Sequence, residues 1–291
     1  MSRTQRDGLL FILLAAVGYA IFPIFTKLIY TDPVLQPLDV LTWRFFFATP
    51  LVWLTLRMLR APQPSVPLPR VKLIVLGVLF AVVAALAFFA LDLIPASLYT
   101  VLLYTYPAIV AVMSLVTGDR LPVRGWLALA LTLTGVVLTV PDLNAGGEIT
   151  PEGIALAVGN AAIYALYLVL SGRVLRGHSA AAYAAAWGIT GSLLAALIVL
   201  PFRTLTVPTV PAAWFGLIGL ALISTIMPSF AMLAGIGRLG ASRAAILSTT
   251  EPVMTVLLAV VLLREQMTAV QLVGGLLVLA SVVLLQIRGR G

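Results

Sequence analysis

The sequence is a tandem repeat, because its second half can be laid on its first at a shift of 145 residues. The shift aligns Gly8 with Gly153, Tyr19 with Tyr164, Thr26 with Ser171, Ala96 with Ala241, Ser97 with Ser242 and Pro107 with Pro252. Each half carries five apolar stretches, and an odd number makes the second half enter a membrane upside down relative to the first. The repeat therefore predicts two inverted halves, the usual plan of a secondary transporter.

The composition indicates an integral membrane protein. Hydrophobic residues make up 62% of the chain and charged residues 10%, with a mean hydropathy of +1.13, whereas soluble domains are about half apolar and about a quarter charged. Apolar stretches of membrane-spanning length occur at 8–29, 39–59, 71–92, 97–117, 124–140, 152–171, 180–200, 211–234, 241–262 and 268–287. We therefore expect an all-α fold of ten transmembrane helices, with no residues left over for a soluble catalytic domain.

The basic residues predict the orientation of these helices. Of the 18 Lys and Arg residues, 14 lie at the termini or in alternate connectors, and cytoplasmic loops are enriched in basic residues. Both termini are therefore expected in the cytoplasm, with the acidic connectors outside. The turn-rich linker 141–151 separates the repeats, predicted as 1–143 and 144–291. The scattered basic residues do not form the one-sided patch that nucleic acid requires.

Several chemistries are excluded by what the sequence lacks. It contains no cysteine, and its one histidine, His178, lies in a predicted loop. Thiolate or histidine metal sites and Cys–His catalytic pairs are therefore not available, and we expect neither a cofactor nor an enzyme. No phosphate-binding Gly-x-x-x-x-Gly-Lys-[Ser/Thr] motif occurs, so the chain is not expected to use ATP.

Polar residues form a stripe on each of two equivalent predicted helices. In the first stretch, Tyr19, Pro23, Thr26 and Tyr30 recur at helical spacing; in the sixth, Asn160, Tyr164, Tyr167 and Ser171 do the same. Such stripes pack helices together or line a shared aqueous cavity. The tyrosines favour the cavity.

Prolines inside the apolar stretches indicate helix breaks. Pro107 and Pro252 release the carbonyls of Leu103 and Ser248 from helical bonding, and Pro23 and Pro228 similarly release those of Tyr19 and Ser224. In a membrane, such carbonyls need protein, water or ligand as partner. For Pro107 and Pro252 we favour a hinge or a cavity lining. For Pro23 and Pro228, a static kink that only shapes the helix is an equally good interpretation.

Two charged residues stand inside predicted spans. Glu251 lies about 15 Å deep at 1.5 Å per residue, where it could bind a substrate ammonium, carry a coupled proton, or pair with Arg44. Arg44 could bind the carboxylate of a ligand through two parallel hydrogen bonds, or it could pair with Asp39 or Asp92.

The candidate cavity residues are Tyr19, Arg44, Tyr99, Tyr106, Asn160, Tyr164, Tyr167, Trp187, Ser248 and Glu251, with Pro23, Pro107, Pro228 and Pro252 as candidate hinges. The fifth and tenth stretches carry almost no polar interior residues. We expect them at the periphery, facing lipid, where their glycines would allow close contact and a homodimer.

Paired motifs resemble a known family. Ala-Ser followed by Pro107 and Gly118-Asp119-Arg120-Leu121, and Ala-Ser followed by Glu251-Pro252 and Arg264-Glu265-Gln266-Met267, resemble the tandem EamA domains of the drug/metabolite transporter superfamily. The overall pattern is similar to YddG-type amino-acid exporters of bacterial inner membranes. The resemblance implies ten helices, alternating access and export of small metabolites, with neutral or aromatic amino acids as expected substrates. A transporter of another metabolite or drug, an intramembrane enzyme and a passive channel are the alternatives.

Overall fold

The computed structural model describes residues 3–61, 63–91, 93–94, 96–117, 122–139, 150–178, 180–200, 204–254, 258 and 268–286, and every regular element in these ranges is a helix. The helices are α1 (Arg3–Ala20), α2 (Phe22–Ile29), α3 (Pro37–Met58), α4 (Arg70–Leu91), α5 (Ala96–Leu103), α6 (Tyr106–Thr117), α7 (Val123–Thr139), α8 (Pro151–Val174), α9 (Ala181–Val199), α10 (Pro211–Ala221), the π-helix η2 (Leu222–Ile226), α11 (Met227–Leu239), α12 (Ala241–Ser248) and α14 (Ala269–Gln286). Helix occurs in each of the ten predicted apolar stretches. The predicted boundary between the halves lies outside the described residues.

Five helical segments are long and apolar enough to cross a membrane: Arg3–Thr26, Arg70–Ala90, Pro151–Val174, Ala181–Ile198 and Pro211–Leu239. Three shorter apolar helices are Val101–Met113, Val123–Leu138 and Ala269–Ser281. The fourth and ninth predicted stretches are divided, because helix is interrupted before α6 and after α12. The described part of the ninth stretch is helical again up to Met254.

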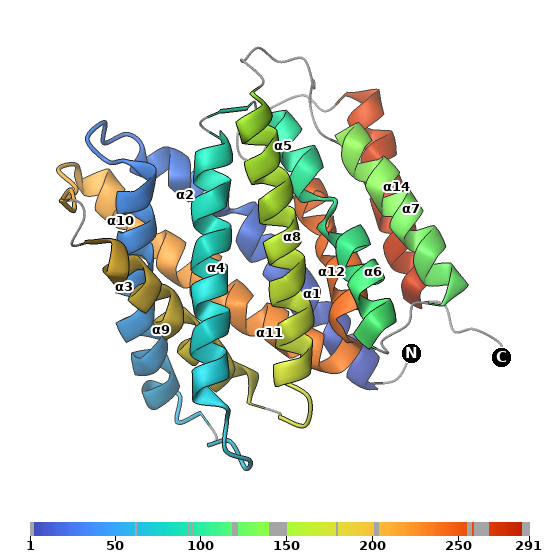
Figure 1. Cartoon of the computed structure of the whole chain (residues 1–291), viewed down its shortest axis with the longest axis horizontal. Helices are drawn as coiled ribbons and strands as arrows, with labels where there is room; N and C mark the ends of the chain where they lie inside the picture. The colour runs from blue at the N-terminus through green and yellow to red at the C-terminus, as the bar shows by residue number, and fades with distance from the viewer. Residues whose placement is uncertain are drawn as a thin grey trace.

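Most contacts between helices have an equivalent: when the repeat shift is applied to both helices of a contact, it gives another contact that the structure contains. The α1–α11 contact corresponds to α8–α4, and the α3–α10 contact corresponds to α9–α4. The helices α7 and α14 are equivalent to each other, so their contact is its own equivalent. This pair runs along one edge of the molecule (Figure 1). As a result, α11 of the second half packs against α1, α10 packs against α2 and α3, and α4 packs with α8 and α9.

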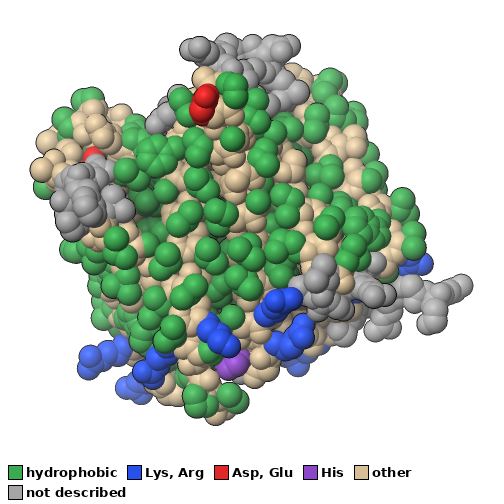
Figure 2. Space-filling view, viewed as in Figure 1, with side chains coloured by type: hydrophobic (Ala, Val, Ile, Leu, Met, Phe, Trp, Pro, Cys, Tyr) green, Lys and Arg blue, Asp and Glu red, His purple; other side chains and the backbone are tan. Residues whose placement is uncertain are grey.

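Charge is distributed unevenly between the two ends of the helices. Figure 2 shows Lys and Arg side chains gathered along the lower end and acidic side chains near the upper end, with hydrophobic side chains covering the surface between them. This arrangement agrees with the separation of basic and acidic connectors in the sequence.

Two carboxylates fasten the connectors at the acidic end. Asp32, whose side chain is fully buried, accepts hydrogen bonds from the backbone N–H groups of Thr209 and Val210. Asp39 accepts from the backbone of Gln36 at 3.0 Å, completing the capping box of α3, and from that of Thr206 at 3.2 Å. These bonds hold the 204–210 connector against the start of α3.

Glycines allow α4 and α9 to approach each other at the level of the backbone. A Cβ atom on Gly77 would collide with the carbonyl of Gly188, and one on Gly191 would collide with the backbone of Ile74. At this crossing the Ser192 hydroxyl donates to the Gly77 carbonyl at 2.8 Å. Small residues are what close packing of membrane helices requires.

Candidate functional site

Two helix breaks, one in each half of the chain, face each other. Helix α5 ends at Leu103 and α12 ends at Ser248, the two residues whose carbonyls Pro107 and Pro252 were predicted to release. The breaks are in contact, because the Tyr106 hydroxyl lies 2.6 Å from Ser248 Oγ. The predicted interruptions are confirmed, and the structure brings them together across the repeat.

The first break changes which side chains share a face. Residues two positions apart in a regular helix point about 200° apart, yet the rings of Tyr104 and Tyr106 lie 6.0 Å apart in one cluster. The interruption at Tyr104 and Thr105 makes this possible. Sequence reasoning did not select Tyr104, since its position matches no helical face.

Glu251 belongs to the same contact between the breaks. Its carboxyl group is hydrogen bonded to the Tyr104 hydroxyl. The repeat shift aligns Tyr106 with Glu251 and Leu103 with Ser248. The Tyr106–Ser248 and Glu251–Tyr104 bonds are therefore near counterparts, with a phenol at the first position and a carboxyl group at the second.

The two polar stripes converge on this contact. The ring of Tyr164 packs edge-on against Tyr106 at 4.8 Å, and Tyr167 stacks on Tyr164 at 6.0 Å. Tyr19, from the other stripe, interacts with both Tyr164 and Tyr167 and hydrogen bonds to Ser229. We call Tyr19, Tyr104, Tyr106, Tyr164 and Tyr167 the tyrosine cluster.

Asn160 lies on α8, within two helical turns of Tyr164 and Tyr167 of the tyrosine cluster. It is fully buried, and its amide group donates to the Val83 carbonyl at 2.6 Å. Among the described residues its Oδ1 atom has no hydrogen-bond partner. A buried acceptor in this condition is costly unless water or a ligand supplies a donor.

Arg44 binds the irregular part of the eighth predicted stretch. Its Nε atom donates to Thr225 Oγ1 at 2.7 Å, and Nη2 donates to the Ser224 carbonyl at 3.0 Å. This is the carbonyl that Pro228 was predicted to release, and it lies in the π-helix η2. The sequence alternatives for Arg44 did not include this partner, because a π-helix cannot be recognised from helical periodicity.

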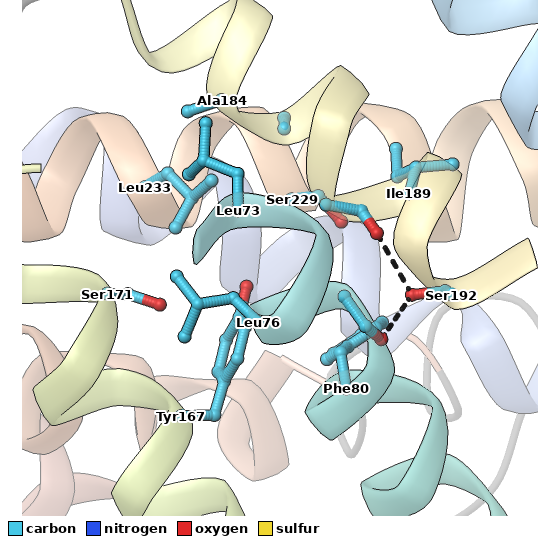
Figure 3. Close-up of a pocket in the computed structure, with 13 residues that line it drawn as sticks. Leu73, Leu76, Phe80, Tyr167, Ser171, Ala184, Ile189, Ser192, Ser229 and Leu233 are labelled. Carbon is cyan, nitrogen blue, oxygen red and sulfur yellow. Dashed lines mark hydrogen bonds between the residues drawn. The ribbon is translucent and has the colours of Figure 1, made fainter. Parts of the chain in front are cut away.

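A small cavity adjoins the tyrosine cluster between α4, α8, α9 and α11 (Figure 3). Its volume of about 20 Å³ is enough for about one water molecule. Tyr167, Ser171 and Ser229 contribute hydroxyl groups to its lining. The fully buried Ser171 hydroxyl interacts with the Tyr167 hydroxyl, so one part of the cavity wall is polar.

Other predicted residues lie elsewhere. Trp187 packs edge-on against Trp53 at 5.2 Å, and the Arg70 guanidinium lies 5.2 Å from its ring, so its ring and cation–π contacts are with residues outside the tyrosine cluster. Tyr99 is buried with Ala90, Ile94 and Ala157. Of the predicted hinges, Pro228 begins α11 beside η2, and α1 and α2 meet immediately before Pro23.

The site is suited to binding a small polar molecule with an apolar part. It combines hydroxyl groups, aromatic faces and one carboxyl group inside a helical bundle. The described residues include no group of three or more His, Asp and Glu side chains that could hold a metal ion. Hydroxyl groups and aromatic rings are the residue types with which binding sites recognise small ligands by hydrogen bonds and ring stacking.

The fold and site define a helical membrane protein whose interior polar groups gather where helices are broken. The chain belongs to the EamA-like transporter family, whose profile matches residues 6–140 and again residues 151–287. The resemblance to EamA domains is thereby confirmed, and the protein is a multi-pass membrane transporter and not an enzyme.

Proteins similar in sequence to this chain are also named as transporters. An uncharacterized transporter of Synechocystis is 26% identical over 98% of this chain and 94% of its own, and an uncharacterized transporter of Bacillus subtilis is 27% identical over 94% and 90%. The threonine/homoserine exporter RhtA of Escherichia coli is 27% identical over 73% of this chain and 70% of its own. A crystal structure with 20% identity shares the fold, with a TM-score of 0.79 over 97% of this chain and 96% of that one.

Proposed function

We propose that the protein exports small neutral or aromatic amino acids across the bacterial inner membrane. The contact between the two helix breaks carries this proposal, because it places Glu251 among tyrosine rings at the centre of the bundle. An acid inside a membrane protein marks a substrate or ion pathway by default. Similarity to a threonine/homoserine exporter supports amino acids as the substrate class.

The transporter works by alternating access between two inverted repeats, with ten membrane crossings and both termini in the cytoplasm. The exchanged helix pairs support this arrangement: α1, α3 and the α10–η2–α11 segment form one group, and α8, α9 and α4 form its counterpart. The cavity supports movement between the groups, since Ser229 and Leu233 of α11 line it together with residues of the second group (Figure 3).

Transport by purified protein in proteoliposomes tests the proposal. Vesicles loaded with labelled threonine, homoserine or phenylalanine should release at least one of them faster than vesicles without protein, and a proton gradient can be imposed to test coupling. Release of none of a full panel of neutral amino acids would exclude the proposed substrate class.

Glu251→Gln should lower the transport rate at least tenfold, because the variant keeps the shape of the side chain and loses its charge and its proton. Glu152→Gln is the matched control, since Glu152 is exposed at the start of α8 and should transport at the wild-type rate. Protein amount and thermal stability are measured in parallel. Wild-type transport by Glu251→Gln would refute the role of this residue.

A further inference from the structure

Arg44 is a buried cation whose partners are all neutral. Only 5% of the residue is exposed, and its hydrogen bonds within the described part of the chain go to the Thr225 hydroxyl and the Ser224 carbonyl. No carboxylate among the described residues pairs with it. A charge buried without a counter-charge is costly, so this position favours an anion.

Hydrogen-bond donors remain available at the same place. A guanidinium group has five N–H donors, and the described residues offer an acceptor to Nε and Nη2 but none to Nη1. The Ser224 hydroxyl is fully buried and also has no partner in the described part of the chain. Arg44 and Ser224 already touch through the Ser224 carbonyl, so these two donors belong to one small region.

The region is connected to the site described above. The Arg44 guanidinium lies 6.0 Å from the ring centre of Phe80, and Phe80 lines the cavity (Figure 3). Tyr19 provides a second connection, because it interacts with Arg44 and hydrogen bonds to Ser229, another residue of the cavity wall. The rings of Phe22 and Phe45 lie 5.4 and 5.5 Å from the guanidinium and form an apolar part of its surroundings.

We infer that Arg44 Nη1 and the Ser224 hydroxyl form a carboxylate-binding subsite of the transporter. This inference rests on the proposed function and names the groups that bind the carboxylate of its amino-acid substrate. Charge-assisted hydrogen bonds of this kind are stronger than neutral ones.

Binding to the purified full-length protein tests the subsite with three matched probes. L-Threonine carries a carboxylate and an ammonium group, L-threoninamide lacks the carboxylate, and 3-hydroxybutyrate lacks the ammonium group. Calorimetry or ligand-induced thermal stabilisation should show threonine binding at least tenfold more tightly than threoninamide.

Ser224→Ala is the decisive variant, because it removes a hydroxyl without a described partner and keeps the carbonyl that Arg44 binds. It should weaken threonine and 3-hydroxybutyrate about tenfold and leave threoninamide unchanged. Ser281→Ala, a buried serine between α7 and α14, should change none of the three affinities.

The outcomes separate this inference from the proposed function. Equal binding of threonine and threoninamide, or unchanged threonine binding by Ser224→Ala, overturns the subsite even if threonine is exported. Retained, Ser224-dependent binding of 3-hydroxybutyrate without amino-acid export overturns the proposed function and supports the subsite. If the wild-type protein binds none of the probes, the subsite is overturned, and the export panel alone decides the proposed function.

Discussion

Tyr106 and Ser248 join the two helix breaks through a bond between hydroxyl groups. A double-mutant cycle of Tyr106→Phe and Ser248→Ala should give a coupling energy of about 0.6 kcal/mol, the average for polar pairs between membrane helices, and at most about 1.7 kcal/mol. Unfolding in mixed micelles measures it. Tyr106→Phe combined with Ser281→Ala should be additive, because Ser281 bonds to Thr132 on a peripheral pair. Additivity in the first cycle would mean that the bond does not stabilise the contact.

Asp32 should make stability depend on pH. Burial alone would raise the pKa of its carboxyl group, but hydrogen bonds from Thr209, Val210 and Val34 outweigh this effect and lower the pKa below its usual 3.8. A lowered folded-state pKa stabilises the fold fully above the unfolded-state pKa, and this stabilisation is lost as the pH falls through the folded-state value.

The melting temperature of the wild-type protein in detergent should therefore fall below about pH 4 more steeply than that of Asp32→Asn. The variant should melt at a lower temperature at pH 7, because its side chain keeps only one acceptor oxygen for the 204–210 connector. Parallel pH profiles of the two proteins would show that the Asp32 charge contributes nothing.

At the level of single residues, sequence patterns identified most of the site but not how it is assembled. The stripes selected Tyr19, Tyr164 and Tyr167, which the structure brings together, because helical periodicity is local. Tyr104 was missed because only the interruption of the helix turns it toward Tyr106. The partners of Arg44 could not be predicted either, since they lie 180 and 181 residues away in a π-helix.

Among the helices, α4 and α9 depend on glycine at their crossing. Gly77→Ala should destabilise the protein by about 1–3 kcal/mol, as overpacking does, because its Cβ would collide with the backbone of α9. Gly159→Ala is the control, since a Cβ at Gly159 meets no atom within 4 Å; it should be neutral or stabilise by up to about 1 kcal/mol. Unfolding free energies in micelles compare them. Equal effects would contradict the described packing.

The helix interruptions show what proline can and cannot predict about an element. The positions of the breaks follow from covalent structure, since proline removes one backbone donor, and α5 and α12 end at the expected residues. The partner of a released carbonyl depends on tertiary packing. For Ser224 the partner is a guanidinium from α3, and nothing near Pro228 in the sequence indicates it.

For the whole molecule, orientation can be tested with single cysteines, because the natural chain has none. Arg176→Cys lies at the basic end and Val207→Cys in the connector at the acidic end, and both residues are exposed. In intact bacterial spheroplasts a membrane-impermeant maleimide should label position 207 and spare position 176, and lysis should make both reactive. The reverse pattern would refute the proposed orientation.

The repeat and its charge pattern anticipated much of the architecture, because both are periodic along the chain. The exchange of α4 and α11 between the two helix groups could not be anticipated, since it is decided by contacts between the halves. Five described segments reach membrane-spanning length, so the ten crossings stay a prediction. Placing single cysteines in the other connectors as well would test it.

The link between Arg44 and η2 has a consequence for biosynthesis. Arg44 is translated 180 residues before Ser224, which at roughly 5–20 residues per second amounts to about 10–40 s. During this interval the nascent chain contains a positive charge in its second apolar stretch and has not yet made the segment that accepts its hydrogen bonds. We therefore expect α3 to stay near water or polar surfaces of the insertion machinery until the eighth stretch has been synthesised.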